Sequence, residues 1–344
     1  MRETQSGQHL AAPAELASTV IRRFDLVRDI EWVYQLWNRS FGPKWALEQS
    51  VLGNRIGAAT MVHVAETHGM PVAISVVGYR ETQTAGLLLI MVEPGSRGQG
   101  IGKKLLTYVE RALATVGVRQ LTLGFGSAGG YFWPGVPVDQ LSAWPFFRRN
   151  GWQERERSFD LVHRFQPHVT PSWVHEQLAR TGTMLRLANA EDAQALTKFE
   201  EANFPIWAPF FRTTFQEEGY RNILLAQDIG GAIVGTLLLQ TDGPVLWSRA
   251  LGVRFGSLSV LGVAPEQQGR GTGIALAATA MEIIKQRGGS GCYIQWTGLV
   301  DWYGKLGTEI WSEYRMSSKG LSQSNTLSGT PGEEVCVEVT ACQV

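Results

Sequence analysis

The chain has 344 residues, of which 44% are hydrophobic and 18% are charged, a composition typical of a globular protein with real cores. Its 31 basic and 31 acidic residues balance, so net charge gives no reason to expect binding to nucleic acid or to an anionic membrane. The N-terminus lacks a signal-peptide pattern and no apolar run approaches roughly 18 residues, so we expect a cytoplasmic protein without a membrane span. The three cysteines, Cys292, Cys336 and Cys342, and the six histidines show no zinc-ligand spacing, which predicts neither a disulfide framework nor a metal site.

The first half of the chain predicts alternating strands and helices. Residues 20–24 are strand-like, and Ile30, Val33, Leu36 and Trp37 then recur at helical spacing. The elements expected next are a hairpin at 61–66 and 72–78, a buried strand at 87–92, a helix at 101–116, a strand at 121–125 and a closing strand at 158–165.

The second half repeats this order after a connection at 166–183, which contains two prolines and a short amphipathic piece. A strand at 184–187 precedes a helix that carries Leu196, Phe199 and Glu200 on one face. The elements expected next are a hairpin at 222–228 and 232–240, a strand at 257–263, a helix at 274–285, and strands at 292–296, 309–317 and 335–339. The repetition indicates two similar domains.

One glycine-rich stretch occurs in both halves. It reads VEPGSRGQGIG over residues 92–102 and VAPEQQGRGTG over residues 263–273. Each copy follows an apolar strand and opens an apolar-periodic helix. A loop of this kind turns successive backbone N–H groups toward one point at the positive end of a helix dipole. Each copy is therefore a candidate site for a phosphate or pyrophosphate.

Two familiar phosphate motifs do not fit this stretch. A P-loop requires Gly at Arg97 and Ser or Thr at Lys104, and the dinucleotide fingerprint requires Gly at Lys103 and at Ile274. The pattern that fits is Arg/Gln-x-x-Gly-x-Gly after a strand that ends in Val-x-Pro. This pattern resembles the acetyl-CoA-binding motif of the GNAT family of N-acetyltransferases, and it is present twice.

The resemblance implies the fold class and the domain organisation. The expected class is α+β, with two tandem GNAT acyl-CoA N-acyltransferase domains, each a mixed, mostly antiparallel sheet flanked by helices. The expected segments are a flexible N-terminus at 1–18, an N-terminal GNAT domain at 19–165, a linker at 166–183, and a C-terminal GNAT domain at 184–344 with a flexible, Ser/Gly/Thr-rich loop at 318–332.

The resemblance also implies acetyl-CoA as cofactor and direct attack by an amine in a ternary complex. Loop N–H groups would hold the pyrophosphate, and N–H groups of the preceding strand would polarise the thioester carbonyl. The candidates in the first half are Ile90, Val92, Arg97, Gly98, Gln99, Gly100, Ile101 and Gly102. Those in the second half are Leu261, Gly262, Val263, Gln268, Gly269, Arg270, Gly271, Thr272 and Gly273.

An acid must protonate the leaving thiolate, and a phenol with a pKa of about 10 can do so. Residues 301–307 resemble the GNAT catalytic helix, and Tyr303 stands at the position of its tyrosine. Phe147 occupies the same position in the first half and cannot donate a proton. The second domain is therefore expected to be catalytic, and the first to bind acyl-CoA without turnover or only to support the fold.

A base must remove a proton from the alkylammonium before it attacks. The strand at 257–263 contains no Asp or Glu, although many GNAT enzymes place one there. The hydroxyls of Ser257 and Ser259 could orient a water that relays the proton. The carboxylates considered for the distant base are Glu201, Asp242 and Asp301.

The aromatic run Tyr131, Phe132 and Trp133, followed by Pro-Gly, is either a packed loop that closes the domain or a platform for a sugar ring. Asp242 and Trp296 are the further substrate-binding candidates. The aromatic loop and the segment around Trp296 are similar to tandem GNATs that acetylate glucosamine and glucosaminides. The resemblance thus favours a small-molecule amine as the substrate, either an amino sugar or an amine-containing natural product. We expect the protein to be a monomer or a homodimer.

Two alternatives remain open from the sequence. A mycothiol-synthase-like acetyltransferase is also a tandem GNAT. An acyl-CoA-binding regulatory or scaffolding protein without turnover belongs to a different functional class, and Tyr303 with two intact glycine loops argues against it.

Overall fold

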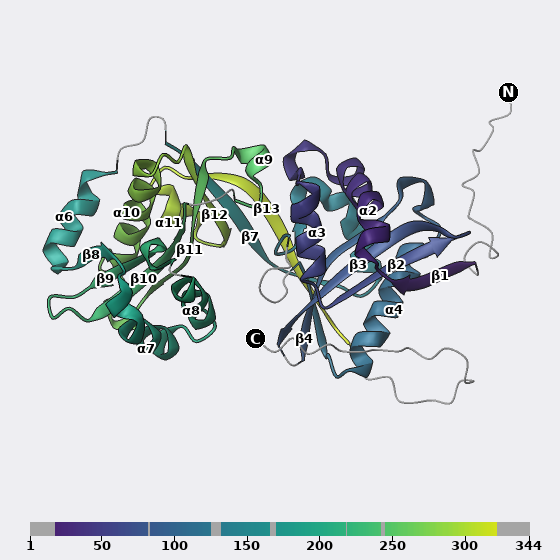
Figure 1. Ribbon diagram of the computed structural model, residues 1–344, viewed down its shortest axis with the longest axis horizontal. Coiled ribbons are helices and arrows are strands. Elements are labelled where there is room, and N and C mark those ends of the chain that lie inside the picture. Colours follow the sequence, from purple (N-terminus) through teal and green to yellow (C-terminus); the bar gives the residue numbers. More distant parts are fainter. Residues whose placement is uncertain are drawn as a thin grey trace, which may run out of the picture. The chain divides into compact units, whose positions relative to one another are not determined.

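The computed structural model describes residues 18–81, 83–124, 132–165, 170–217, 219–241 and 245–321. The chain divides into two compact units (Figure 1): the first comprises Met1–Ser158 with Tyr314–Val344, and the second comprises Phe159–Glu313. Two long strands, β7 (Gln153–Arg164) and β13 (Glu309–Gly320), each begin in one unit and end in the other. The part of β13 from Tyr314 onward therefore belongs to the first unit, whereas the sequence pattern groups the whole strand with the second half.

The first unit is a mixed sheet covered by helices. Its strand order is β1-β2-β3-β4-β5-β13, β6 pairs with β13, and β4 and β5 are parallel while the other pairs are antiparallel. Its remaining elements are β1 (Thr19–Arg23), α2 (Leu26–Phe41), η1 (Pro43–Trp45), α3 (Gln49–Gly57), β2 (Met61–Thr67), β3 (Met70–Glu81), β4 (Thr84–Val92), η2 (Pro94–Ser96), α4 (Ile101–Thr115), β5 (Gln120–Leu123), β6 (Val136–Pro137), η3 (Val138–Ala143) and α5 (Trp144–Arg149).

The second unit repeats this plan. Its strand order is β7-β12-β11-β10-β9-β8, with β11 and β12 parallel and the other pairs antiparallel. Its remaining elements are α6 (Ser172–Thr181), β8 (Met184–Leu187), η4 (Ala190–Asp192), α7 (Ala193–Asn203), α8 (Ala208–Gln216), η5 (Gly219–Asn222), β9 (Ile223–Gln227), β10 (Ile233–Gln240), α9 (Ser248–Leu251), β11 (Phe255–Val263), η6 (Pro265–Gln267), α10 (Thr272–Gln286), β12 (Gly291–Thr297) and α11 (Val300–Gly304).

Helices cover both faces of the second sheet (Figure 1). On one face, Leu237 of β10 and Leu258 of β11 pack in a core with α10 and Tyr303 of α11. On the other face, Leu238 of β10 and Val260 of β11 pack with α7 and α8. Neighbouring residues of β10 point to opposite faces because side chains alternate along a strand. Groups on α10 or α11 and groups on α7 therefore reach the sheet from opposite sides.

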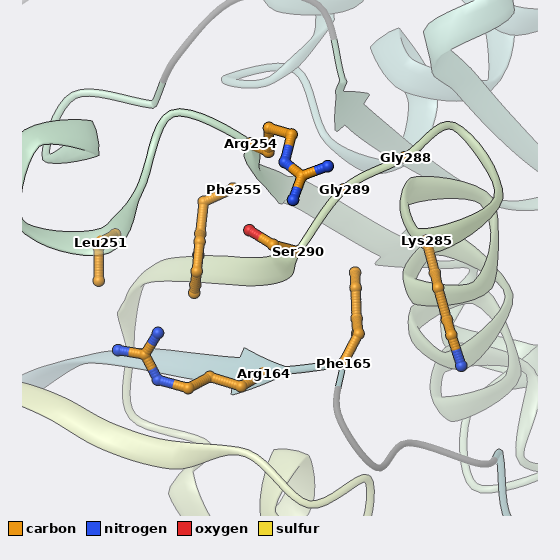
Figure 2. Close-up of a pocket in the computed structure, with 9 residues that line it drawn as sticks. All are labelled: Arg164, Phe165, Leu251, Arg254, Phe255, Lys285, Gly288, Gly289 and Ser290. Atoms are coloured by element: carbon orange, nitrogen blue, oxygen red, sulfur yellow. The ribbon is translucent and has the colours of Figure 1, made fainter.

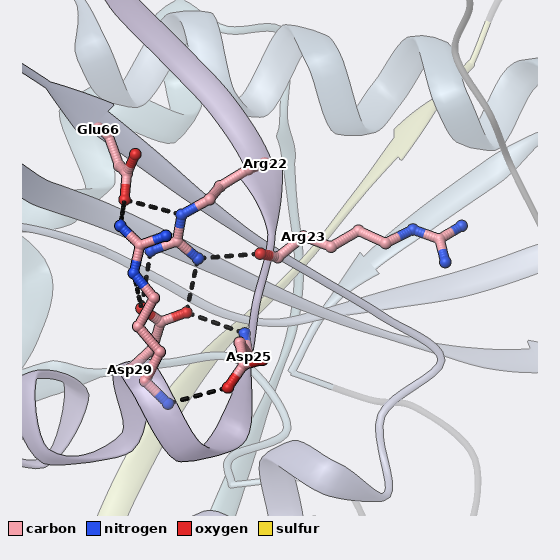
Figure 3. Close-up of polar contacts among 6 residues, drawn as sticks. Arg22, Arg23, Asp25, Asp29 and Glu66 are labelled. Atoms are coloured by element: carbon pink, nitrogen blue, oxygen red, sulfur yellow. Dashed lines mark hydrogen bonds and ion pairs between the residues drawn. The ribbon is translucent and has the colours of Figure 1, made fainter. Parts of the chain in front are cut away.

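In each unit an arginine of an end strand pairs with an aspartate near the start of the helical segment that follows it. Figure 3 shows Arg22 of β1 donating to both carboxylate oxygens of Asp29, each at 2.7 Å, while the backbone N–H of Asp25 donates to the same carboxylate at 2.9 Å. In the second unit Arg186 of β8 donates to both oxygens of Asp192, at 2.7 and 2.6 Å. Burial raises the pKa of Asp29, but the hydrogen bonds from Arg22 and Asp25 outweigh it and hold the pKa below its usual value. This shared Arg–Asp ion pair allows α2 and α7 to be aligned residue by residue, with Asp29 at the position of Asp192.

The predicted fold class is confirmed, with mixed sheets and flanking helices in both units. One difference is that β13 continues through Ser318 to Gly320, where the sequence predicts a loop, because Ser318–Gly320 pair with β5. The strand expected at 335–339 lies outside the described residues. Within the described segments, no helix is long and apolar enough to cross a membrane.

Candidate active site

The two glycine loops have the same backbone conformation. The φ angles are 79° and 84° at Gly98 and Gly100, and 74° and 91° at Gly269 and Gly271. These values lie in the left-handed region, which glycine adopts without strain. The helices α4 and α10 start directly after Gly100 and Gly271, and no described side chain caps either start. The first N–H groups of both helices are left to bind an external acceptor such as a pyrophosphate.

The first residue of each motif stabilises the loop from inside. Arg97 donates through Nε to the carbonyl of Val92 at 3.0 Å, and Gln268 donates through Nε2 to the carbonyl of Val263 at 2.9 Å. Both side chains therefore fold back onto the end of the preceding strand. This contact explains why either Arg or Gln serves at this position, since both place an N–H donor at the same distance along the side chain.

The second sheet opens beside its glycine loop. β11 and β12 pair only from Phe255–Leu258 with Gly291–Ile294, and beyond Leu258 no further residue pair joins these two strands in the described chain. The register between β10 and β11 shifts at the same level, and Val260 has a φ of 44°. A β-branched residue in the left-handed region marks a bulge under strain. Leu261–Val263, the predicted carbonyl-polarising segment, lie beyond the last residue of β11 that pairs with β12.

The first sheet has part of this arrangement. Among the described residues, β4 and β5 pair over Thr84–Leu87 and Gln120–Leu123, and the register between β3 and β4 shifts next to Leu87. Ile90 and Val92 lie beyond the last of these pairs.

Tyr303 lies on the α10 side of the second opening. It is 6% exposed, and its ring meets Trp302 edge-on with 4.7 Å between centroids. A Cβ placed on Gly273 would lie 3.3 Å from Trp302 and 3.6 Å from Leu261, so α11, the start of α10 and β11 meet here. Burial, and then the nearby Cys292, raise the pKa of Tyr303, which keeps the phenol protonated at neutral pH.

Phe147 takes the corresponding place in the first unit. It lies in α5 and is 7% exposed, and its neighbour Phe146 packs 3.4 Å from a Cβ position on Gly102, as Trp302 does on Gly273. In both units an aromatic side chain packs on the glycine loop, and the next residue is a phenylalanine in the first unit and a tyrosine in the second.

One titratable residue that sequence reasoning did not select, Glu200, lies on the α7 side of the second sheet. Glu200 is 1% exposed, and its Oε1 accepts a hydrogen bond of 2.5 Å from the hydroxyl of Thr236. Burial raises the pKa of Glu200 to about 7, although the Thr236 hydrogen bond lowers it. The signal in the sequence was a carboxylate on the same helix face as Leu196 and Phe199.

Of the three carboxylates that the sequence suggested as bases, Glu201 and Asp301 lie in the described residues. Glu201 is more than half exposed and pairs with Arg212 at 3.0 Å, and Asp301 is exposed at the start of α11. Ser257 is buried and donates to Gln240 at 3.3 Å. Asp242 lies outside the described residues.

The aromatic loop of the first unit is packed inside it. Phe132 and Trp133 are 1% and 5% exposed. Trp133 stacks on Trp37 with 5.3 Å between centroids and meets Trp45 edge-on at the same distance. This placement agrees with a packed loop, because the ring faces that would hold a sugar are covered by other rings. Tyr131 lies outside the described residues.

Trp296 stands at the end of β12, where the second sheet opens. It is half-buried and has a φ of 55°. Its backbone N–H donates to the buried carboxylate of Asp160 at 3.0 Å, and the Tyr293 hydroxyl donates to the same carboxylate at 2.5 Å. Asp160 thereby holds the unusual backbone of Trp296 in place.

The second glycine loop also has a neighbour in α6. Gln177 donates to the carbonyl of Arg270 at 2.6 Å and itself accepts a hydrogen bond from Arg180. A Cβ on Gly271 would lie 2.3 Å from Cγ of Gln177, whereas no atom lies within 4 Å of such a position on Gly269. Helix α6, which lies in the segment that connects the two halves, thus contacts the second glycine loop directly.

A cavity of about 610 Å³ lies at the opposite end of β11 (Figure 2). Arg164, Arg254 and Lys285 surround it, and Arg164 lies over the ring of Phe255 at 5.4 Å. Because β11 runs from Phe255 at this cavity to Val263 at the glycine loop, the cavity is separate from the opening described above. All three cationic residues are exposed at the surface.

Comparison with known families identifies the class of protein. A model described as acetyltransferase (GNAT) domain matches residues 58–154, and one described as acetyltransferase (GNAT) family matches residues 184–307. The chain belongs to the GNAT family and carries two GNAT domains in tandem. It is an acetyltransferase, and enzymes of this fold use acetyl-CoA.

Solved structures resemble most of the chain. A GCN5-related glucosamine N-acetyltransferase region of a fungal multi-domain GH3 β-N-acetylglucosaminidase is 25% identical, with a TM-score of 0.81 over 87% of this chain and 38% of that one. This chain therefore spans well under half the length of that protein. No curated protein sequence matches the chain.

Two further structures share the tandem fold. A GCN5-related N-acetyltransferase from Sphaerobacter thermophilus is 18% identical, with a TM-score of 0.69 over 91% of this chain and 99% of that one. A tandem GNAT protein from the clavulanic acid biosynthesis pathway is 15% identical, with a TM-score of 0.62 over 89% of this chain and 100% of that one. At these identities the likeness concerns the fold alone.

Proposed function

We propose that the second unit transfers the acetyl group of acetyl-CoA to the primary amine of a small molecule, by direct attack of the amine in a ternary complex. The observation that carries this proposal is the convergence of three features at one place. They are the opening between β11 and β12, the uncapped start of α10, and the buried phenol of Tyr303.

Each feature supplies one part of the chemistry. The N–H groups of Gln268–Gly273 bind the pyrophosphate of the cofactor, where a side chain in place of the glycines would keep the phosphates away. The backbone of Leu261–Val263 polarises the thioester carbonyl and stabilises the charge that develops on its oxygen. Tyr303 donates its proton to the thiolate that leaves. Acetyl-CoA supplies the activated acyl group.

The first unit has a different role in this proposal. Arg97–Gly102 have the geometry of a cofactor loop, and Ile90 and Val92 precede it as Leu261 and Val263 do in the second unit. Phe147 offers no proton at the position of Tyr303. The first unit therefore binds acetyl-CoA without turnover or supports the fold alone.

We further propose an amino sugar as the acceptor. Support comes from the similarity to a fungal region described as a glucosamine N-acetyltransferase, at 25% identity. Trp296 offers a half-buried indole at the opening, and a flat apolar ring face suits a sugar. Phe132 and Trp133 are left out of this acceptor site because they are buried in the first unit.

Release of the CoA thiol from acetyl-CoA tests the function. We expect turnover with glucosamine and with other small primary amines. N-acetylglucosamine and glucose are the matched controls, because they keep the ring and lack the free amine, and we expect no turnover with either. Tight binding of CoA without turnover on any amine would contradict the enzyme and favour a regulatory acyl-CoA-binding protein.

A further inference from the structure

The buried carboxyl group of Glu200 has one oxygen without a partner. Glu200 is 1% exposed, and Oε1 accepts the hydrogen bond from Thr236 at 2.5 Å. Oε2 is buried and makes no hydrogen bond within the described chain. An unsatisfied buried carboxylate oxygen destabilises a fold, so such a group calls for a functional explanation.

Glu200 lies next to the part of β11 that faces the thioester in the proposed reaction. Its hydrogen-bond partner Thr236 is paired with Gly262 across β10 and β11. Residues opposite each other in an antiparallel pair are about 5 Å apart and point to the same face. The ring of Phe204, four residues after Glu200, covers Gly262 on this face and lies 2.4 Å from a Cβ position there. The carboxyl group therefore lies beside the bulged segment of β11.

Glu200 and Tyr303 approach the opening from opposite faces of the sheet. Tyr303 packs in the core on the α10 side with Leu237 and Leu258. Thr236 precedes Leu237 on β10 and points to the other face, where it meets Glu200. Acyl transfer needs an acid at the leaving thiolate and a base at the attacking amine, on two sides of the carbonyl carbon. The opening between β11 and β12 provides this separation.

We propose that Glu200 is the general base of the second unit and that the acceptor amine enters from the α7 face. This inference rests on the proposed function. The ammonium transfers one proton to the Glu200 carboxylate, and the free amine forms the C–N bond as the C–S bond breaks. The thiolate takes the Tyr303 proton. Glu200 then releases its proton to solvent, and the nitrogen of the new C–N bond loses its second proton to solvent as the amide forms. One of these two protons returns to Tyr303, so that the products are the amide, the CoA thiol and one proton.

The equivalent positions of the first unit have neither this base nor the acid. Glu200 lies eight residues after the buried Asp192, and Trp37 lies eight residues after its counterpart Asp29. Trp37 is fully buried and donates to the carbonyl of Trp45 at 2.7 Å. At the position of Thr236 the first unit has Ile74, one residue after Ala73, which pairs with Val92 as Gly235 pairs with Val263. Both proton-transfer groups are thus confined to the second unit.

The charged groups near Glu200 are paired with one another or exposed, so burial is the main influence on the pKa of Glu200. On α7 and α8, Glu201 and Arg212 pair with each other at the surface, and Lys198 is exposed. Asp192 at the start of the helix is neutralised by Arg186. β10 carries no charged residue. The pKa of Glu200, raised by burial to about 7, matches a base that works near neutral pH.

Glu200→Gln tests the proposal in the full chain, with Glu201→Gln as the matched control. Both variants remove one carboxylate from adjacent positions of α7. For Glu200→Gln we expect kcat/KM for the amine to fall by about 10²- to 10⁴-fold, with unchanged affinity for acetyl-CoA. The residual rate of this variant should increase with pH only as the amine itself loses its proton. The increase near pH 7 that titration of Glu200 causes in the wild type should be absent. Glu201→Gln should behave as wild type.

Thr236→Val provides a second variant that keeps the carboxylate. The Thr236 hydrogen bond lowers the pKa of Glu200, so its loss should move the midpoint of the rate–pH profile upward while the plateau rate stays near wild type. A purely structural role of Glu200 would move no midpoint.

The outcomes distinguish failure of Glu200 as the general base from failure of the proposed acetyltransferase function. Wild-type rates and an unshifted pH profile in Glu200→Gln would overturn Glu200 as the base and leave the acetyltransferase proposal standing. An unchanged midpoint in Thr236→Val would count against it in the same way. No turnover by the wild-type chain on any amine would overturn the proposed function, and the role of Glu200 with it.

Discussion

At the level of single residues, the two halves differ at two buried positions that can carry a proton in the second unit only. Tyr303 and Phe147 occupy equivalent places behind the two glycine loops, and both are buried. Glu200 and Trp37 occupy equivalent places on the opposite side of each sheet. Phenylalanine and tryptophan preserve the packing and remove the acid–base chemistry. Both units therefore keep a packed core at these positions, and only the second has titratable side chains there.

Tyr303→Phe should lower kcat by roughly ten- to a thousand-fold, the range expected for a general acid. The substitution removes one hydroxyl and keeps the ring that packs on Trp302, so the affinity for acetyl-CoA should stay at the wild-type value. Steady-state thiol release and direct CoA binding measure the two quantities separately. Phe147→Tyr is the reciprocal control and should leave the rate unchanged. A wild-type kcat in Tyr303→Phe would remove the acid role from this residue.

The sequence identified Tyr303 because it belongs to a local motif. Glu200 could not be assigned in this way, since its role depends on Thr236, 36 residues further along the chain, and on the pairing of Thr236 with Gly262. Helical periodicity placed Glu200 on the same face as Leu196 and Phe199. It could not reveal that one carboxylate oxygen lacks a partner, because that depends on tertiary packing.

At the scale of elements, the glycine loops have one backbone and different surroundings. The matching φ angles at Gly100 and Gly271 follow from glycines at matching positions before a helix. Gln177 of α6 contacts only the second of these loops. The contact was not predictable, because the sequence indicated α6 only as a short amphipathic piece within the connection.

Gly271→Val should abolish CoA binding to the second unit and with it turnover. Valine is strained at a φ of 91°, and its Cβ would collide with Gln177. Gly100→Val should leave turnover unchanged, since the first loop precedes Phe147. Titration calorimetry with CoA, which gives the number of sites, together with the thiol assay measures both effects.

Gln177→Ala is the control for the collision at Gly271. It removes the contact and leaves the glycine backbone intact, so CoA should still bind. Loss of turnover in Gly100→Val would instead assign the productive site to the first loop.

At the scale of the whole molecule, the chain completes its first unit with its last described strand. Ser318–Gly320 pair with Gln120–Thr122 of β5, and Tyr314 pairs with Pro137 of β6. Tyr314 is fully buried, and its ring lies 6.3 Å from that of Trp45. The first sheet and its aromatic core therefore depend on residues that follow the entire second unit in sequence.

A fragment of residues 1–165 should fail to fold cooperatively. It lacks β13, so β5 loses its antiparallel partner and Trp45 loses the packing of Tyr314. Thermal unfolding followed by circular dichroism, compared between the fragment and the full chain, measures the effect. Adding a peptide of residues 309–321 supplies the missing strand and should raise the unfolding temperature of the fragment. A cooperative transition of the fragment alone, at the temperature of the full chain, would contradict this account.

Features that depend on local pattern were predictable from the amino-acid sequence. Alternating and helical periodicity predicted most strands and helices, and the repeated glycine motif predicted the tandem family, because both signals lie within a few neighbouring residues. Tyr303 and Phe147 distinguished the halves for the same reason.

Contacts between distant residues became visible only in the folded chain. The tertiary structure pairs Ser318–Gly320 of β13 with β5 in the first sheet, since strand partners depend on packing and hydrogen bonding over the whole chain. It buried Phe132 and Trp133, and it brought Glu200 to the face of the opening across from Tyr303. Burial shifts the pKa of a carboxyl group, and proximity decides which atoms it can contact. Both arise only when the two faces of a sheet have formed.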